Sequence, residues 1–298
     1  MHHSPEHRIK PILQALFVTL LWSSSFVIIK LGLSEIPPLV FAGLRYFIAA
    51  LCLLPMLLKN ENKSQIRSLS GSDWRKLILY GIIFIALTQG TMFLGLSLLP
   101  SVTVSLMLNF TPIVVAIMGI FLINEIPTKQ QWFGSLLFIT GILIFFSPTS
   151  LEGSRTLGII VMSLGVLFNA ASSVLGRDIN RNMKHSPIVI TTISMTIGSA
   201  ILLTIGISLH GFPSISFTNW MLLLWMAVIN TAFAFTMWNK TLQSLTAMES
   251  SIINGTMLIQ IALLAWIFLG EEITLIEGVG MIIAAAGALM VQLKRKLK

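Results

Sequence analysis

The sequence predicts an all-α polytopic membrane protein with about ten transmembrane helices, arranged as two inverted five-helix repeats. Three observations predict this fold class: an apolar composition, a regular series of apolar stretches, and a similarity between the two halves of the chain. Hydrophobic residues make up 55% of the 298 residues, charged residues only 10%, and the mean hydropathy is +0.89. One soluble core could not bury that much apolar surface, so the chain requires lipid as its solvent.

The apolar stretches follow one another along the whole chain with short breaks between them. A helix of about 20 apolar residues crosses a hydrocarbon core of about 30 Å with every backbone polar group bonded internally. In chain order, the predicted spans are residues 11–33, 38–58, 77–97, 101–123, 131–147, 157–176, 186–209, 219–242, 247–269 and 274–293. No soluble domain fits between these spans.

Basic residues fall almost entirely in every second break. Those on one side are Arg8, Lys10, Lys59, Lys63, Arg67, Arg75, Lys76, Lys129, Arg177, Arg181, Lys184, Lys240, Lys294, Arg295, Lys296 and Lys298. The breaks on the other side hold only Lys30 and Arg155. Since basic loops face the cytoplasm, we expect a multi-pass protein of the cell (plasma or inner) membrane whose tails, residues 1–10 and 294–298, are both cytoplasmic. This orientation explains the net charge of +8, so we expect the lipid bilayer as a partner and no nucleic acid.

Internal repetition divides the chain into two units, residues 11–148 and 155–293. Adding 146 to positions in the first unit pairs Glu125 with Glu271, Gly134 with Gly280 and Gly141 with Gly287. If each unit holds five spans, the second begins on the opposite side of the membrane and the repeats are inverted. Inverted repeats are a recurrent transporter architecture, with the substrate site near the bilayer midplane at the repeat interface.

Motifs in both halves resemble a known family. The first half carries Leu96-Ser97-Leu98-Leu99-Pro100-Ser101, Asn109-Phe110-Thr111-Pro112, and Phe121-Leu122-Ile123-Asn124-Glu125. The second carries Gln243-Ser244-Leu245-Thr246-Ala247 and Leu269-Gly270-Glu271. With Leu21-Trp22-Ser23-Ser24-Ser25-Phe26 and Phe41-Ala42-Gly43-Leu44-Arg45, the pattern is similar to the EamA module of the drug/metabolite transporter superfamily over nearly the whole chain.

The resemblance implies two inverted five-helix halves and the export or exchange of small metabolites, amino acids or related solutes. One position departs from internal symmetry, because Leu258 stands where the first half has Pro112. A proline removes a backbone donor and frees a carbonyl one turn earlier. We therefore expect a kink with a gating role at Pro112 in the fourth span and none at the matching place in the ninth.

Arg45 is the most informative polar residue, because a charge inside a span is costly and usually faces a cavity or a neighbouring helix. It lies about 10 Å below the outer surface, counting from Pro38 at about 1.5 Å per residue. Its planar donor fork suits a substrate carboxylate. The alternative is a structural arginine that bonds carbonyl groups of a neighbouring helix, and the sequence leaves both open.

Other candidates for a solute cavity are neutral. Trp22 falls near mid-depth in the first span, whereas we place Trp74, Trp132, Trp220, Trp238 and Trp266 in the interfacial belt. Ser24 and its neighbours either face the cavity or hold helices together. Deep amides come from several spans, and their convergence would form a hydrogen-bonding cavity: Gln89, Asn109, Asn169, Asn230 and Asn254, with Gln260 nearby.

Several chemistries find little support in the sequence. The deep spans hold no histidine or paired carboxylates, and there is no GxSxG, HExxH or P-loop, so we expect no enzyme, no metal and no cofactor. Glu249 is a candidate for a proton relay, but a solvated role at a helix end is expected instead. A single cysteine, Cys52, excludes an intramolecular disulfide.

The expected function is secondary transport of small metabolites, amino acids or related amphipathic solutes, by alternating access through a central cavity. A polytopic receptor or sensor, or an intramembrane enzyme, is the alternative. Small residues at Gly134, Gly141, Gly280, Ala284 and Ala288 favour close packing of the two end helices, or else a homodimer. The chain is expected to be a monomer or a homodimer.

Overall fold

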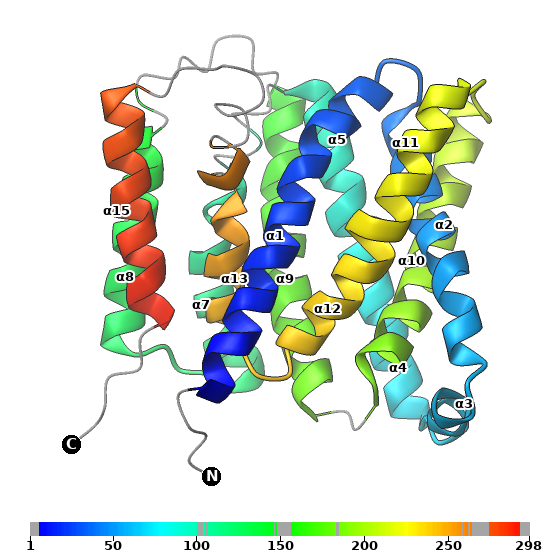
Figure 1. Cartoon of the computed structure of the whole chain (residues 1–298), viewed down its shortest axis with the longest axis horizontal. Helices are drawn as coiled ribbons and strands as arrows, with labels where there is room; N and C mark the ends of the chain where they lie inside the picture. Colours follow the sequence, from blue (N-terminus) through cyan, green and yellow to red (C-terminus); the bar gives the residue numbers. More distant parts are fainter. Residues whose placement is uncertain are drawn as a thin grey trace.

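The computed structural model describes residues 6–99, 104, 107–145, 147, 156–182, 185–257, 259–261, 263 and 274–292, and every element that these residues form is a helix (Figure 1). The first half contains α1 (Glu6–Gly32), α2 (Pro38–Leu57), α3 (Asn60–Arg67), α4 (Gly71–Tyr80), η1 (Gly81–Gln89), α5 (Gly90–Leu98), α7 (Thr111–Ile123) and α8 (Lys129–Phe145). The second contains α9 (Thr156–Asn182), α10 (Pro187–His210), α11 (Phe217–Ala227), η2 (Val228–Phe233), α12 (Ala234–Thr241), α13 (Ala247–Gly255) and α15 (Leu275–Gln292). The predicted tails lie largely outside the described residues, as do Glu271 and Leu258.

Most helices agree with the predicted spans, but the predicted span 101–123 is interrupted by a turn before α7 begins at Thr111, and α13 covers only the start of the predicted span 247–269. Five helices are long and apolar enough to cross a bilayer, namely Pro38–Leu57, Gly71–Leu98, Thr156–Asn182, Pro187–His210 and Phe217–Thr241. Two of these contain a π-helical segment, η1 or η2, in which each turn holds one residue more than an α-helix would. The all-α polytopic fold is therefore confirmed, whereas the short exposed helix α3 and both π segments were not predicted.

Local signals fix where the helices begin. Ser70 and Thr246 form capping boxes with Asp73 and Glu249, so side chains bond the first free N–H groups of α4 and α13. Pro38 begins α2 at a position where a missing N–H costs nothing. These caps place the span ends within a few residues of the hydrophobic boundaries.

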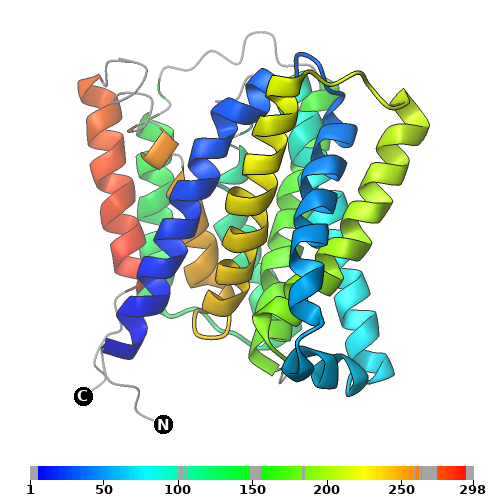
Figure 2. The same ribbon diagram turned by 45° about the vertical axis from the view of Figure 1, so that its right-hand side comes forward.

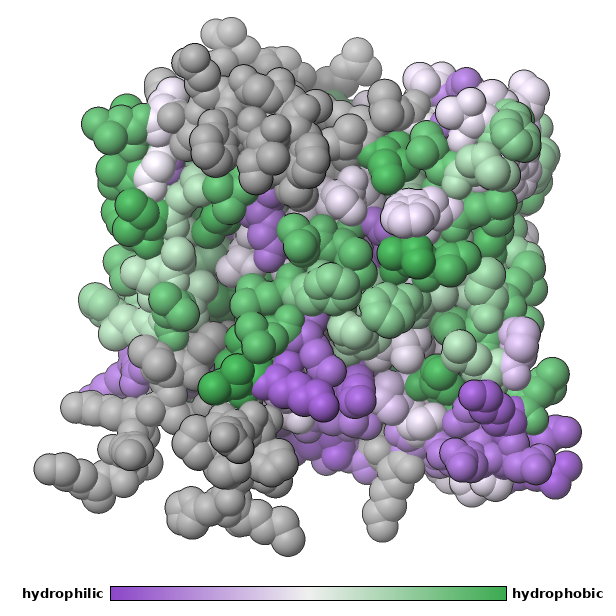
Figure 3. Space-filling model, viewed as in Figure 1, coloured by the Kyte–Doolittle hydropathy of each residue, from purple (hydrophilic) through white to green (hydrophobic). Residues whose placement is uncertain are grey.

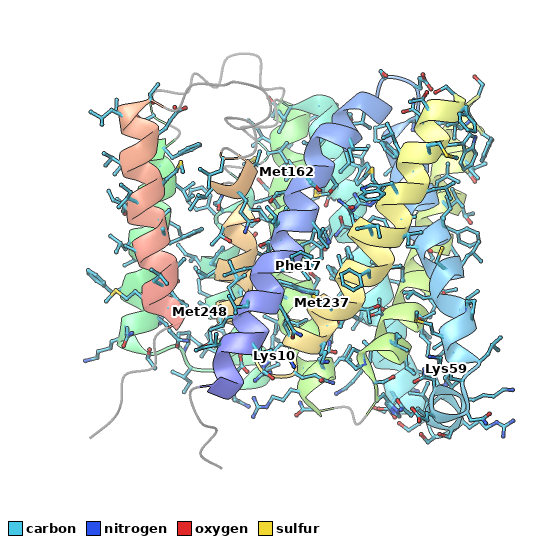
Figure 4. All side chains as sticks on the ribbon, viewed as in Figure 1. Lys10, Phe17, Lys59, Met162, Met237 and Met248 are labelled. Carbon is cyan, nitrogen blue, oxygen red and sulfur yellow. The ribbon has the colours of Figure 1, made fainter. Side chains whose placement is uncertain are left out.

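The two halves run in opposite directions through the bundle. Helix α1 begins, and α15 ends, at the lower end of Figure 1, while α1 and α9, the first long helix of each half, cross the bundle in opposite senses. The lower end also carries the largest hydrophilic areas visible in Figure 3 and the labelled Lys10 and Lys59 in Figure 4. We name it the basic end.

The end helices of the halves, α8 and α15, stand together at one edge of the bundle (Figure 2). A Cβ added at Gly141 would lie 2.7 Å from the carbonyl oxygen of Gly280, and one at Gly134 would lie 2.9 Å from that of Gly287. Gly141 therefore packs against Gly280, the counterpart of Gly134, and Gly134 packs against Gly287, the counterpart of Gly141. A two-fold relation between the halves requires this exchange of partners. The preferred prediction, that these small residues pair the end helices, is confirmed.

A second antiparallel pair, α2 and α10, forms near the opposite edge. Gly43 meets the backbone of Leu203, and Gly206 meets the backbone of Val40, so side chains are excluded from both crossings. Helix α10 also packs against η1, where Gly81 faces Gly198. The largest apolar core gathers around these helices and α12, and it supports one side of an internal cavity.

Candidate functional site

A cavity of about 100 Å³ lies between the two halves. Its walls come from α1, α2, α4, η1 and α5 of the first half and from α9, α12 and α13 of the second. Residues of both repeats are therefore needed to enclose it. Met162, which lines it, lies farther from the basic end than Lys10 does (Figure 4).

One wall of the cavity is aromatic, with Phe235 at its centre. Its ring centroid lies 4.9 Å from that of Trp22, 5.1 Å from that of Phe84 and 5.5 Å from that of Tyr46. Tyr80 stacks on Phe84 at 5.1 Å, and Trp238 lies 5.1 Å from Trp22. Such tilted and edge-on pairs hold each ring in place, so the wall offers a rigid apolar surface to a solute.

A second wall carries the polar groups, which are uncharged apart from Arg45, beside apolar residues such as Met92 and Met162. The hydroxyl groups of Ser172 and Ser173 donate to the carbonyl oxygen of Asn169, at 2.8 and 2.9 Å. Thr91 donates in the same way to the Leu87 carbonyl at 2.7 Å. Because these hydroxyl protons bond within their own helices, the oxygens present lone pairs to a ligand. The wall therefore favours a ligand with hydrogen-bond donors.

Arg45 lines the cavity and is only 2% exposed. Its Nε donates to Thr231 Oγ1 at 2.8 Å, and Nη2 lies 3.4 Å from the carbonyl oxygen of Asn230. The guanidinium also lies 5.4 Å from the centre of the Tyr46 ring. All of these partners are neutral.

The π segments explain how these partners are presented. Thr231 and Thr88 each donate to a carbonyl five residues earlier, those of Met226 and Ile83, at 2.8 and 2.7 Å. The Asn230 carbonyl in η2 also accepts from Trp22 Nε1 at 3.0 Å, which joins α1 to η2. Subtracting 146 from the bounds of η2 gives residues 82–87, which lie inside η1. The irregular segments therefore occupy equivalent places in the two halves, next to the cavity.

Five of the predicted cavity residues do line the cavity: Trp22, Arg45, Gln89, Asn169 and Asn254. Gln89 accepts a hydrogen bond from the Tyr46 hydroxyl at 2.7 Å. Asn230 lies outside the lining, and its side chain donates to the Leu21 carbonyl at 2.6 Å and to Ser24 Oγ at 3.1 Å. Ser24 is exposed and joins α1 to η2 through that bond.

Asn109 and Pro112 lie beside the cavity wall rather than in it. Asn109 is buried in the turn before α7, where a Cβ at Gly255 would come within 3.3 Å of its Oδ1 atom. Pro112 stands in the first turn of α7 and does not kink a continuous helix. The physical reason is that a proline at this position needs no backbone donor, whereas inside a helix it would break a hydrogen bond.

Several lining residues were missed or misplaced from the sequence. Trp238 is 7% exposed and faces the cavity, so its expected place in the interfacial belt is wrong. Phe235, Tyr80 and Tyr46 gave no sequence signal beyond being aromatic residues in apolar stretches. Glu249 is a capping residue, with its carboxylate accepting from the Thr246 N–H at 2.9 Å, and it is buried rather than solvated.

Below the cavity, toward the basic end, a buried polar cluster links four helices. Tyr80 and Asn180 both donate to Asn239 Oδ1, at 3.2 and 2.9 Å, and Asn239 donates to Thr191 Oγ1 at 2.8 Å. The four residues belong to α4, α9, α12 and α10. Tyr80 also lines the cavity, so the cluster adjoins it.

Near the same end, an ion pair also joins the two halves. Glu125, just after α7, accepts from Arg177 Nε at 2.9 Å and from Arg181 at 3.4 Å. Its second oxygen accepts from the N–H of Ala247 at the start of α13, at 3.1 Å. Arg177 also donates to the Leu242 carbonyl at the end of α12, at 2.7 Å. We call these five residues the basic-end latch.

The chain shows clear similarity to known proteins. The sequence profile described as the EamA-like transporter family matches residues 9–147 and 156–293. An uncharacterized transporter of Bacillus subtilis, YoaV, is 25% identical over 288 residues, which covers 95% of this chain and 96% of that protein. A probable amino-acid metabolite efflux pump of Salmonella typhimurium is 25% identical over 290 residues, covering 92% and 91%.

A solved crystal structure with 16% sequence identity superposes with a TM-score of 0.77 over 95% of this chain and 96% of that one, which shows a shared fold. Homologues are named as transporters, and an Escherichia coli relative, YedA, is named an inner membrane transporter, with 27% identity over 70% of this chain and 69% of its own. Apolar spans, inverted halves and two profile matches agree. The chain is a membrane protein and belongs to the EamA-like transporter family.

Proposed function

We propose that this chain is a secondary transporter that exports or exchanges small metabolites, amino acids or related amphipathic solutes, by alternating access through the central cavity. The observation that carries the proposal is the cavity itself, which is enclosed by both inverted halves and has one aromatic and one polar wall. Rocking one half against the other exposes such a site to each side of the membrane in turn.

The cavity chemistry supports an amphipathic solute. The rings around Phe235 suit an apolar group, while the serine and asparagine oxygens of α9 suit an ammonium group. The efflux-pump name of the Salmonella relative supports the same solute class. We place the two repeat units at residues 11–148 and 155–293, with the basic end in the cytoplasm of a bacterial-type inner or plasma membrane. A monomer or a homodimer is compatible with this arrangement.

Transport is favoured over an intramembrane enzyme or a receptor. Among the described residues, the cavity lining has no histidine, cysteine, aspartate or glutamate, which are residue types that often supply a base or a metal ligand. The same lining favours facilitated movement or solute exchange over proton antiport, because a proton relay in a span commonly uses a carboxylate.

Counterflow tests the proposal. Purified protein in liposomes loaded with an unlabelled amino acid should accumulate the same labelled amino acid without a pH gradient. Accumulation only under a gradient would contradict facilitated exchange and would direct attention to Glu249. No counterflow with any amino acid would overturn the proposed solute class, and nucleoside-like and cationic solutes would be the next panel.

A further inference from the structure

We infer that Arg45 binds the carboxylate of the transported solute, an assignment that rests on the proposed function and names the residue that recognises one group of the solute. The starting observation is that Arg45 lies at the cavity wall and is nevertheless buried, with only 2% of the residue exposed. An arginine keeps its charge at every physiological pH. Burying such a charge is costly unless an anion and hydrogen bonds compensate it.

No anion compensates Arg45 within the described part of the chain. The ion pairs there join Lys76 to Asp178, Arg177 and Arg181 to Glu125, and His185 to Asp73. All of them lie toward the basic end. Arg45 instead has two hydrogen-bond acceptors from η2, the Thr231 hydroxyl and the Asn230 carbonyl.

Arg177 is also a buried arginine, but its partners differ from those of Arg45. Arg177 is 8% exposed, and it has both a carboxylate, Glu125, at 2.9 Å and a carbonyl, that of Leu242, at 2.7 Å. It is the pattern expected of a buried structural arginine. Arg45 has the neutral acceptors of that pattern and lacks the carboxylate, and it faces a cavity where Arg177 faces protein.

The hydrogen bonds to Thr231 and Asn230 leave some N–H donors of the Arg45 guanidinium available. Nε is held by Thr231 and one Nη2 hydrogen is directed at Asn230, while Nη1 has no hydrogen-bond partner among the described residues. A guanidinium carries five N–H donors in a planar fork that matches the two oxygens of a carboxylate. The Nη1 and Nη2 ends can therefore receive a carboxylate without breaking the bond to Thr231.

The neighbouring side chains fit the rest of such a solute. Tyr46 follows Arg45 on α2, and its ring lies 5.5 Å from Phe235, so an apolar group next to the carboxylate meets the aromatic wall. The oxygens of Ser172 and Ser173 lie on the polar wall, where they accept from an ammonium group. Arg45 thus selects acids over the matching amides.

The test compares amino acids with their own carboxamides, which keep the ammonium group and the side chain and lose the anion. Leucine, phenylalanine and the two amides are used in counterflow and in thermal unfolding of the detergent-solubilised protein. We expect the wild type to prefer each acid by about 10- to 100-fold in apparent affinity, the range for hydrogen bonds to a charged group. Arg45→Gln should lower acid transport to the level of the amide and leave the amide unchanged.

Two variants separate binding from structure. Arg45→Lys keeps the charge and loses the fork, so it should retain part of the preference for the acid. Arg67→Gln removes an exposed arginine at the end of α3, outside the basic-end latch and the cavity, and should leave the preference as it is in the wild type. An equal loss of acid and amide transport in Arg45→Gln, with Arg67→Gln unaffected, would make Arg45 a structural residue and overturn the inference.

The wild type alone also decides the question if the Arg45 variants fail to fold. A ligand that binds the folded protein raises its unfolding temperature, so leucine or phenylalanine should stabilise the wild type more than its amide does. Equal stabilisation by acid and amide, or none by either, would contradict the inference. Stabilisation by the acids without counterflow would support the carboxylate site while overturning transport of amino acids as the proposed function.

Discussion

At the scale of single residues, Glu35 shows how one exposed carboxylate ties two spans together. It lies between α1 and α2 and accepts from the Ser216 N–H at 3.3 Å, at the start of α11. Hydrogen bonds from the Asn219 side chain, and then from Ser216, hold the pKa of Glu35 below its ordinary value of 4.5. A carboxylate with a lowered pKa stabilises the fold above the unfolded-state value and loses that contribution as the pH falls.

We therefore expect Glu35→Gln to lower the unfolding temperature at pH 7, and we expect this difference from the wild type to shrink as the pH falls below about 4.5. Thermal unfolding in detergent over pH 3 to 8 measures it. Glu61→Gln, which changes an exposed carboxylate on α3, is the control. A difference for Glu35→Gln that stays constant with pH would show that its charge is not involved.

Glu249 shows why a residue type in a span does not reveal its role. Its carboxylate accepts from the Thr246 N–H, and its own backbone N–H donates to the Thr246 hydroxyl. These two hydrogen bonds cap the start of α13. Arg45 and Arg177 are both arginines within helices, yet only the contacts across the fold distinguish a paired charge from one that faces a cavity. The sequence left Arg45 with two interpretations for this reason.

At the scale of helices, the glycine contacts between α8 and α15 predict a position-specific effect. A side chain at Gly280 would lie 2.7 Å from the carbonyl oxygen of Gly141, against backbone that cannot move aside. Gly278, in the same helix, has no atom within 4 Å of where its Cβ would be. Gly280→Val should therefore lower stability by about 1–3 kcal/mol through overpacking, and Gly278→Val should have much less effect.

Chemical or thermal unfolding of the two variants in the same detergent makes the comparison. Because both replace glycine with valine within α15, any change in helix propensity is common to them. A similar loss of stability in both would mean that propensity, not the contact with α8, sets the effect. Unchanged stability in both variants would contradict the close approach of the end helices.

The sequence predicted helix positions well and helix irregularities poorly. Apolar length determines where a span lies, so Pro38–Leu57 and Leu275–Gln292 fall within a few residues of the predicted 38–58 and 274–293. The π segments depend on contacts between helices, such as the hydrogen bond from Trp22 to the Asn230 carbonyl, and no local sequence pattern predicts them. Pro112 was recognised as a special position, but whether it kinks a helix or begins one depends on the chain before it.

At the scale of the whole molecule, the two-fold relation explains which predicted residues meet. Residues from α1, α2 and η1 face residues from α9 and α13 because inverted halves bring their midpoints to one depth, which is how five of the predicted residues came to line one cavity. The aromatic wall was not predictable, since Phe235 and Trp238 could equally face lipid. Which side of a helix faces inward is decided by packing between helices.

The arrangement of the two halves also predicts which contacts break when the basic end opens. Toward the basic end from the cavity, both the cluster around Asn239 and the basic-end latch join elements of the two halves, so buried contacts close this end. Glu125 belongs to the first half, while Arg177 and Ala247 belong to the second. In the proposed alternating access, the halves separate here, which breaks the bonds of Glu125.

Weakening the latch should therefore expose the cavity from the basic end. In a Cys52→Ser background, Ser173→Cys places one thiol in the cavity lining, and a membrane-impermeant thiol reagent applied from the basic end reports its accessibility. We expect Glu125→Gln to raise the labelling rate by about tenfold, because a charge-assisted bond contributes on the order of 1.5–3 kcal/mol and the amide retains part of it.

Asp178→Asn is the matched control, since it breaks the ion pair with Lys76 at the same end. That pair is more exposed, with side chains 39% and 23% accessible, and joins α4 to α9 through a 3.0 Å contact. Exposed pairs contribute little, so its loss should leave the labelling rate within about twofold of the parent. Equal rates for Glu125→Gln and the parent would show that the halves stay together for another reason. Faster labelling in both variants would assign the closure to the charge of the whole basic end rather than to Glu125.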